Sequence, residues 1–490
     1  MGERVSLPGP SFNRSVKIES RAERLSSDGG ALVLRECWER LGMFDWLSGR
    51  IVDVRDPNRI THPLSELLST HLLMLGQGWT DQNDANALRD DPAFLIGRSE
   101  DRGVAPLMGK GTEESTRELA SQATLSRLVE MLSCDRNRSV LEEALVVSAG
   151  RRVRAMRGHR LYNVTIDVDS LSIEVDGNQT GSAYNGYYRK QVYHPLMATL
   201  GDTGDIVGVS LRAGNVHTAD GVLAFVLPIV ERVEREVGVV AAVRVDAGMP
   251  DEEFCAGLEK AGKHYVARIR NNKSLDRLAC PWEDRFLSGD LGPDGFRLDD
   301  GTCVFEAGTY QAGSWSRPRR VVLVMRQKPD ELLPHYFWLL TSWSKEQIPA
   351  WRLLPIYRQR GTAEGYMGEM KDVLDPALSS TNRVKRHYQG KEIENKTAPR
   401  DAMAANAVLL LMNCLAYNMI HVVRVLLEKQ TKEDWSLQRT RATVLKVATR
   451  FLVHSRRITV VIARSATRWW QGLWMRLASL RPPPCLARMA

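Results

Sequence analysis

The segment Tyr357–Lys371 places four groups that could act on a phosphate at helical spacing. Its sequence, YRQRGTAEGYMGEMK, separates Tyr357, Arg360, Glu364 and Lys371 by gaps of three, four and seven residues. Because an α-helix turns about 100° per residue, one helix would hold these side chains within an arc of roughly 60°. A carboxylate binds a divalent metal ion, while Arg and Lys bind phosphate oxygens. The spacing indicates a metal ion beside a phosphate, and a solvated helix face with an ordinary Arg–Glu pair is the alternative.

Three aspartates stand inside or directly after strand-like segments. Asp167 and Asp169 lie in residues 161–175, where apolar and polar residues alternate, and Asp246 follows the apolar run at residues 239–245. A carboxylate in such a position is costly unless it is paired or binds a metal ion. Asp167 and Asp169 face the same way, so either could contact the ion.

The order of the predicted elements favours a mixed α/β protein. Three strands, a helix, a strand, a helix and a strand follow one another between residues 161 and 269, which is the order of a ribonuclease-H-like core. In such a core the first and fourth strands are neighbours, so Asp169 and Asp246 would meet. A later helix would add Glu364. Three carboxylates can hold two Mg²⁺ or Mn²⁺ ions about 4 Å apart, which suits in-line displacement at phosphorus.

We expect six segments along the chain. They are a basic arm at residues 1–25, a helical N-terminal DNA-binding domain at 26–155, the first part of the core at 156–271, a β-rich insertion at 272–347, the second part of the core with the glutamate helix at 348–428, and a basic helical tail at 429–490.

Aromatic and basic residues outside the core are candidates for DNA contacts. Trp338 and Trp343 are the tryptophans of the insertion nearest the glutamate helix, and they could stack on a base displaced from a duplex end. Packing in the protein core is their alternative. Residues 451–490 hold seven arginines, including Arg456 and Arg457, and no acidic residue. Such a tail suits phosphate contacts, and an amphipathic helix packed on the body is the alternative.

The composition narrows the class of protein. The 490 residues carry a net charge of +8, which favours a polyanionic partner. Seven scattered cysteines without a C-x-x-C pair argue against a zinc cluster or a disulfide framework and fit a reducing cytoplasm. No phosphate-binding GxxxxGK[ST] loop or GxGxxG turn is present, so we expect no nucleotide cofactor. The apolar run at residues 402–423 contains three Asn and one His, which favours a buried helix over a membrane span.

The Tyr-x2-Arg-x3-Glu-x6-Lys spacing resembles the signature of DDE transposases of bacterial insertion sequences. More specifically, the chain resembles insertion-sequence family 1380, from about residue 27 to residue 425. The segments that carry it are DPNRITHPLSELL, NDANALRDDPAF, ASQATLSRL, TIDVDS, YYRKQVYHPLMATLGDTGDIVGVSLRAGNVHTADG, VRVDAGMPDEEF, RGTAEGYMGEMK and AANAVLLLMNCLAYNMI. Residues 247–249 (Ala-Gly-Met) and Gly365 depart from the family's usual residues.

The resemblance implies a catalytic triad of Asp169, Asp246 and Glu364 that binds divalent metal. Its Asp-Ser register favours Asp169 over Asp167. It also implies a β-strand insertion before the glutamate, a homodimer on paired DNA ends, and cutting and joining at terminal inverted repeats.

The sequence therefore predicts a metal-dependent DNA transposase. The enzyme would hydrolyse a phosphodiester at each terminal inverted repeat and join the freed 3′-hydroxyl to target DNA. Tyr357, Arg360 and Lys371 would hold the DNA phosphates. A related endonuclease without strand transfer, or a DNA-binding protein with a spent site, are the alternatives. We expect a bacterial protein of the cytoplasm, associated with the nucleoid through DNA and without a membrane partner.

Overall fold

The computed structural model describes residues 5–7, 10–13, 15–101, 103–108, 118–177, 179–328, 331, 333–380, 387–388, 391–392 and 401–481. The chain divides into two units. The first comprises Met1–Gly49, Asp53–Leu128 and Val422–Leu480, and the second comprises Arg50–Val52, Val129–His421 and Arg481–Ala490. All three predicted catalytic carboxylates belong to the second unit.

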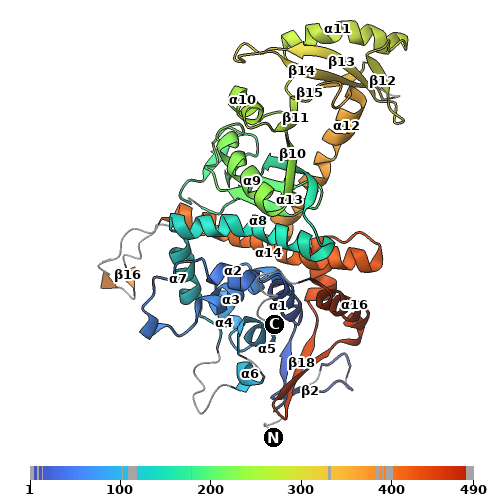
Figure 1. The fold of residues 1–490 in the computed structure, drawn as a ribbon. Coiled ribbons are helices and arrows are strands. Elements are labelled where there is room, and N and C mark those ends of the chain that lie inside the picture. Colours follow the sequence, from blue (N-terminus) through green and yellow to red (C-terminus); the bar gives the residue numbers. More distant parts are fainter. Residues whose placement is uncertain are drawn as a thin grey trace. The chain divides into compact units, whose positions relative to one another are not determined.

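The second unit is built on a mixed sheet of nine strands in the order β12-β13-β14-β15-β11-β10-β4-β8-β9 (Figure 1). The strands are β4 (Leu161–Ser170), β8 (Leu196–Leu200), β9 (Ile206–Ser210), β10 (Gly238–Val245), β11 (His264–Ile269), β12 (Gly295–Arg297), β13 (Cys303–Tyr310), β14 (Arg319–Arg326) and β15 (His335–Thr341). Strands β4, β10 and β11 are parallel. The other neighbours pair antiparallel. The mixed α/β class is as predicted, and the expected adjacency of the first and fourth core strands is confirmed by the β4–β10 pairing.

Helices cover both faces of this sheet because its strands alternate apolar residues between the two faces. On β13, Cys303 and Phe305 join one buried cluster, and the intervening Val304 joins the other. The first cluster packs against α8 (Asp135–Arg157), α9 (Val222–Glu236), α10 (Glu252–Lys260) and α11 (Lys273–Ser288). The second packs against α12 (Ala350–Arg358). After α12, α13 (Arg360–Leu374) contacts β4 and β8.

The predicted β-rich insertion is an extension of the core sheet. It begins with helix α11, and its strands β12 to β15 then continue the sheet through the antiparallel β15–β11 pair. Figure 1 shows α11 lying across these added strands. The segment therefore contains the expected strands, and their hydrogen bonds join them to the core.

A small three-stranded sheet follows β4 along the chain. Its order is β5-β7-β6, with β5 at Ile173–Glu174, β6 at Ala183–Asn185 and β7 at Lys190–Tyr193. The chain passes from β7 directly into β8, the neighbour of β4. This sheet therefore adjoins the end of β4 that carries Asp169. A further two-stranded pair joins β16 (His387–Tyr388) to β17 (Lys391–Glu392).

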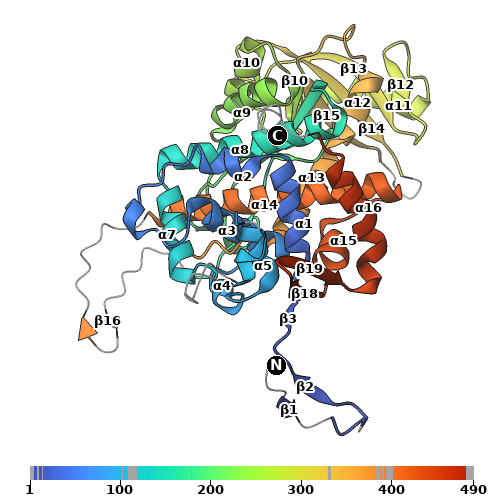
Figure 2. The same cartoon turned by 60° about the horizontal axis from the view of Figure 1, so that its bottom comes forward.

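The first unit is mainly helical. Its strands are β1 (Val5–Leu7), β2 (Ile18–Ser20), β3 (Arg24–Ser26), β18 (Thr449–His454) and β19 (Arg457–Ile462). Its helices are α1 (Gly30–Arg40), α2 (Met43–Ser48), α3 (Leu64–Gln77), α4 (Asp84–Ala87), α5 (Pro92–Arg98), α6 (Ala105–Met108), α15 (Leu437–Thr440) and α16 (Thr467–Ala478). The boundary between the two units falls inside α7 (Gln122–Leu132). Figure 2 shows the C-terminal elements in red. The expected helical tail is wrong for Thr449–Ile462, because apolar and polar residues alternate there and form the β18–β19 hairpin, which pairs with β3.

Helix α14 (Ala402–Thr431) contains the long apolar run. By length and composition it is the one helix among the described residues that could cross a membrane, and 89% of its most apolar window is buried. Its Asn418 side chain accepts a hydrogen bond from the backbone N–H of Ile206 at 3.0 Å. Burial and this polar contact support the predicted core helix.

A buried ion pair joins α8 to the start of β9. The Arg152 Nε donates to Asp205 Oδ1 at 2.7 Å, and Asp205 is 1% exposed. Burial opposes the charge of Asp205, but Arg152 outweighs it and lowers the pKa of Asp205 to about 2. Since the folded state holds this proton less tightly than the unfolded chain does, the pair's stabilisation is present above about pH 4. It should be lost as the pH falls from about 4 to about 2.

The substitution Arg152→Met should lower the free energy of unfolding at pH 7 by about 3–5 kcal/mol, because it leaves a buried carboxylate unpaired. The matched control is Arg235→Met, which removes a partly exposed pair with Glu143 at 2.7 Å between α9 and α8. That control should cost about 1 kcal/mol or less. Urea unfolding followed by circular dichroism from pH 2 to pH 7 measures both effects. Equal losses at pH 7 would contradict the assignment.

Candidate active site

Two parallel strands bring the aspartates to one edge of the sheet. Asp169 is the ninth residue of β4, and Asp246 directly follows β10. Val168 on β4 lies opposite Val245 on β10, so the next residue of each strand is an aspartate. The carboxyl ends of two neighbouring strands therefore present Asp169 and Asp246 together.

Helix α13 supplies the glutamate, but the predicted continuous helix is wrong. Helix α12 ends at Arg358, and α13 begins at Arg360, after Gln359. In an unbroken helix the carbonyl of Ile356 would accept the backbone N–H of Arg360. Instead, Arg244 Nη1 donates to that carbonyl at 2.7 Å. The guanidinium therefore occupies the acceptor that would have continued the helix.

The guanidinium of Arg360 lies among all three carboxylates. Its Nη2 is 2.5 Å from Asp169 Oδ2, and its Nη1 is 4.0 Å from Asp246 Oδ1. Nη1 also donates to Glu364 Oε1, one helical turn later. The Arg360 side chain is 10% exposed, whereas those of Asp246 and Glu364 are about half exposed. The predicted phosphate ligand is thus an internal partner of the predicted metal ligands.

Burial and like charge shape the electrostatics of this cluster. Burial, with the negative charges of Asp246 and Glu364, raises the pKa of Asp169 to about 6, against the opposing effect of Arg360. Burial opposes the charge on Arg360, yet Asp169 and Asp246 raise its pKa above the ordinary value. The cluster therefore concentrates negative charge and retains one firmly protonated guanidinium.

The carboxylate oxygens are hard ligands of the kind that Mg²⁺ and Mn²⁺ prefer. All three carboxylates face the same guanidinium, through two different nitrogens. Within the described part of the chain, no three acidic, His or Cys side chains lie close enough together to hold a metal ion. The chemistry of the donor set fits a divalent ion, which would take the place of the Arg360 guanidinium among the carboxylates.

The other two residues of the signature differ in their relation to the cluster. Tyr357 lies on α12, on the other side of the helix break from Arg360. Burial raises its pKa to about 12, and Arg360, Asp246 and Glu364 all act on it electrostatically, so its hydroxyl lies near the site. Lys371 is half-buried and lies seven residues after Glu364 on α13, about 10 Å along the helix axis.

Asp167, the alternative metal ligand, is held in a buried ion pair with Arg244. Arg244 Nε donates to Asp167 Oδ1 at 2.5 Å, and Nη2 donates to Oδ2 at 2.6 Å. Both side chains are 1% exposed. Arg244 also donates to the Gln359 side chain at 3.1 Å. We call Asp167, Arg244, Ile356 and Gln359 the joint cluster, because it holds the junction between α12 and α13.

Gly201 makes room for the joint cluster. A Cβ on this residue would lie 2.3 Å from Arg244 Nη2 and 2.5 Å from Asp167 Oδ2. Any side chain at residue 201 would therefore displace the bidentate pair. Sequence analysis missed Arg244, although an arginine in the apolar run at residues 239–245 was a signal for a buried partner.

Trp338 does not offer a ring to DNA. It pairs with Ile269 on the neighbouring strand and is 0% exposed, inside the first buried cluster. A nucleobase cannot stack on a ring that is fully covered by protein. The core-packing alternative is therefore correct for Trp338.

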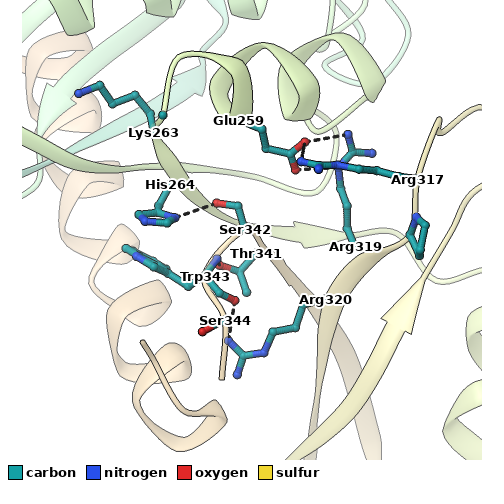
Figure 3. A pocket seen from close by; sticks show the side chains of 12 residues that line it. Glu259, Lys263, His264, Arg317, Arg319, Arg320, Thr341, Ser342, Trp343 and Ser344 are labelled. Atoms are coloured by element: carbon teal, nitrogen blue, oxygen red, sulfur yellow. Dashed lines mark hydrogen bonds and ion pairs between the residues drawn. The ribbon is translucent and has the colours of Figure 1, made fainter. Parts of the chain in front are cut away.

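Trp343 lines a cavity of about 460 Å³ (Figure 3). One face of its ring stacks on His264, with centroids 5.2 Å apart. His264 begins β11 and pairs with Ala242, four residues before Asp246 on β10, which is about 13 Å along the strands. Trp343 therefore lies beside the start of β11, and its stacking on a base displaced from a duplex end stays a prediction.

The cations around this cavity already have partners. Arg319 Nη1 is 2.6 Å from Glu252, Arg317 Nη2 is 2.5 Å from Glu259, and Arg320 Nη2 is 2.6 Å from Glu306. Figure 3 shows Arg317 and Arg319 converging on Glu259. The cavity therefore offers little unpaired positive charge to a nucleic acid.

Arg456 and Arg457 lie at the turn of the β18–β19 hairpin in the first unit. Both are exposed, and Arg456 has a φ of 63° in the left-handed region. An exposed turn leaves both guanidinium groups accessible to phosphates, and their role in DNA binding stays a prediction.

Comparison of the chain with known protein families identifies the family to which it belongs. The family described as Transposase DDE domain group 1 matches residues 9–481 of the chain. No curated protein matches. Among solved structures, the chain is similar to the piggyBac transposase synaptic complex with hairpin DNA, determined by cryo-electron microscopy. The two share 12% sequence identity with a TM-score of 0.38, over 84% of this chain and 78% of that chain.

Proposed function

Because the chain belongs to the Transposase DDE domain family, we propose that it is the transposase of an insertion sequence similar to family 1380. It cleaves a phosphodiester bond at each terminal inverted repeat and joins the freed 3′-hydroxyl to target DNA. The observation that carries this proposal is the meeting of Asp169, Asp246 and Glu364 around one guanidinium at the carboxyl edge of β4 and β10.

The strand arrangement supports a ribonuclease-H-like core. Counting from β4, the core strands lie in the order third, second, first, fourth, fifth, with the second antiparallel to the first and the fourth and fifth parallel to it. The sequence-based core required the first strand beside the fourth, and β4 pairs with β10. The carboxylates then occupy the end of the first strand, the end of the fourth strand and a later helix.

Transposases with a DDE domain generally use divalent metal ions. Asp169, Asp246 and Glu364 would hold two such ions, which lower the pKa of the attacking water and offset charge on the leaving oxygen. Asp169, whose side chain is 23% exposed, is the most sheltered of the three carboxylates. Arg360 exchanges its carboxylate partners for phosphate oxygens, which its fork of N–H groups fits equally well. Tyr357 supports this contact through its hydroxyl, and Lys371, further along α13, holds a neighbouring phosphate.

The partners follow from this chemistry. The enzyme binds DNA at its terminal inverted repeats and at the target, and a homodimer holds two ends together. It acts on DNA in the bacterial cytoplasm, where the nucleoid supplies its substrate. The net charge of +8 favours such a polyanionic partner.

Three outcomes of one experiment separate the proposal from its alternatives. The full chain is incubated with labelled duplexes from both ends of the genomic interval that holds its gene, with supercoiled target plasmid and with Mg²⁺. Cleavage at the ends followed by labelled plasmid supports a transposase. Cleavage without joining indicates an endonuclease, and binding without cleavage indicates a spent site. If the chain neither binds nor cleaves the duplexes, with Mg²⁺ or with Mn²⁺, the proposal is overturned.

The exposed arginines of the β18–β19 turn give a separate prediction. The double change Arg456→Gln/Arg457→Gln should weaken DNA binding and reduce the slope of log K against log salt by about 1–2, because each lost phosphate contact releases about one counterion fewer. Fluorescence anisotropy between 50 and 300 mM salt measures the slope. The control Arg138→Gln removes another basic side chain, which pairs with Asp135 at 2.6 Å. An unchanged slope in the double variant would assign the turn a structural role.

A further inference from the structure

The β6–β7 turn presents aromatic rings beside the carboxylate cluster. Tyr187 is 88% exposed and Tyr184 is 64% exposed, whereas Tyr188 is half-buried. The rings of Tyr187 and Tyr188 meet edge to face, with centroids 5.0 Å apart. The turn also carries Arg189, which is exposed. We call residues 184–189 the tyrosine turn.

Several contacts hold the tyrosine turn in one conformation. The Asn185 side chain accepts the backbone N–H of Tyr187 at 3.0 Å and donates to the Gly214 carbonyl at 2.9 Å. The backbone N–H of Arg189 donates to the Asn185 carbonyl at 2.7 Å, and Arg189 has a φ of 55°. An exposed ring on a fixed backbone has little conformational entropy left to lose on binding.

The base of the same small sheet is buried and anchored. Tyr193 on β7 is 0% exposed, and its hydroxyl donates to the Thr180 carbonyl at 2.6 Å. Asn406 on α14 donates to that hydroxyl at 3.1 Å. The exposed tyrosines therefore stand on a rigid support, whereas Tyr193 belongs to the core.

The tyrosine turn lies near Asp169 because the strands that carry the two are connected and because Tyr188 reaches back toward Asp169. Asp169 pairs with Met197 on β8, and four residues later Ile173 on β5 pairs with Tyr193 on β7. The ring of Tyr188 lies 6.0 Å from that of His194, between these two pairs. Burial, Tyr187 and the carboxylate of Asp169 raise the pKa of Tyr188, so its hydroxyl feels the charge of the cluster.

We propose that the tyrosine turn binds the DNA strand beside the scissile phosphate, with Tyr187 stacking on a base that leaves the duplex and Arg189 contacting the adjoining phosphate. This inference rests on the proposed function and names the surface that positions its substrate. Two features carry it. The rings are exposed on a fixed turn, and the turn is continuous with the strand that holds Asp169. Every base has a face for an aromatic ring, so the contact does not depend on sequence.

The first arm of the test measures cleavage. The change Tyr187→Ala should slow single-turnover cleavage of end DNA by about 10-fold, whereas Tyr187→Phe, which keeps the ring, should stay within about 2-fold of the wild type. The matched control is Tyr162→Ala. Tyr162 is 81% exposed but lies at the other end of β4, seven residues before Asp169. Since Tyr187 is exposed, its loss should leave the melting temperature unchanged.

A duplex with one abasic site identifies the base. When the base that stacks on Tyr187 is removed from the DNA, Tyr187→Ala should have no further effect on the rate. An Ala variant that cleaves like the wild type would overturn the proposal. A 10-fold loss that persists with every abasic position within five nucleotides of the cut would also overturn it.

The second arm does not need cleavage. Duplexes with 5-iodouracil at each position near the end are irradiated in complex with the full chain, and crosslinked peptides are identified by mass spectrometry. Crosslinks at Tyr187 but not at Tyr162 support the proposal, and their absence at every position overturns it. If crosslinks form but no DNA is cut, the proposed transposase activity fails while the binding surface stands. If DNA is cut without such crosslinks, the proposed activity stands and the tyrosine turn is not the binding surface.

Discussion

Replacing Glu364 by Gln should reduce DNA cleavage by about 1,000-fold or more while DNA binding survives, because a metal ion contributes several kcal/mol to the transition state. The amide keeps the shape of the side chain but loses the charged oxygen that contacts Arg360. Asp169→Asn should have an equal effect, since its carboxylate contacts the same guanidinium at 2.5 Å. Asp169 and Glu364 belong to one cluster with Arg360 and act as a unit. The double variant Asp169→Asn/Glu364→Gln should therefore lose no more cleavage activity than either single variant.

The control lies on the same helix. Glu369 is five residues after Glu364, which places it about 140° around the helix. Glu369→Gln should therefore cleave at nearly the wild-type rate. Single-turnover cleavage with anisotropy in parallel separates chemistry from binding. An inactive Glu369→Gln beside an active Glu364→Gln would refute the assignment of the glutamate, and an active Asp169→Asn would exclude Asp169.

Loss of Arg244 should be the most destabilising change in the joint cluster. The variant Arg244→Met leaves the carboxylate of Asp167, which is 1% exposed, without its partner. It should lower the free energy of unfolding by about 3–5 kcal/mol. It also frees the Ile356 carbonyl, which Arg244 contacts at 2.7 Å. Urea unfolding measures the loss.

A second variant separates stability from positioning. In Arg244→Met/Asp167→Leu both charges are replaced by apolar groups, which should restore most of the stability. Cleavage should stay low, by about 10- to 100-fold, because α13 has lost the contact that sets its start and small misplacements of reacting groups are costly. If the double variant is both stable and fully active, the joint cluster has no part in placing Glu364.

The aspartates could be placed from the sequence because their signals are local. Alternation along residues 161–170 and the apolar run before Asp246 define two strands, and the order of elements makes those strands neighbours. Glu364 could be assigned to a helix by its spacing. The break at Gln359 could not be foreseen, since it depends on Arg244, which is 115 residues earlier and reaches the Ile356 carbonyl and the Gln359 side chain.

The tryptophans show a different limit of sequence-based prediction. Trp338 follows the alternation of β15, and its full burial depends on the first buried cluster, which distant elements build together. Trp343 comes soon after the end of β15, and its stacking on His264 depends on the pairing of β15 with β11, which the sequence does not reveal. The tyrosines at residues 184–188 lie in a short segment without strong periodicity. Their exposure and their closeness to Asp169 depend on how β5, β7 and β8 connect.

The scatter of the carboxylates along the chain has a consequence during protein synthesis. Asp169 and Asp246 leave the ribosome well before Arg360 and Glu364, which come together on α13. At 5–20 residues per second, the roughly 200 residues between Asp169 and Glu364 take about 10–40 s to make. A nascent or prematurely terminated chain that ends before α13 therefore carries the two aspartates without the residues that complete their cluster. Partial translation products should thus be unable to nick the gene from which they are still being expressed.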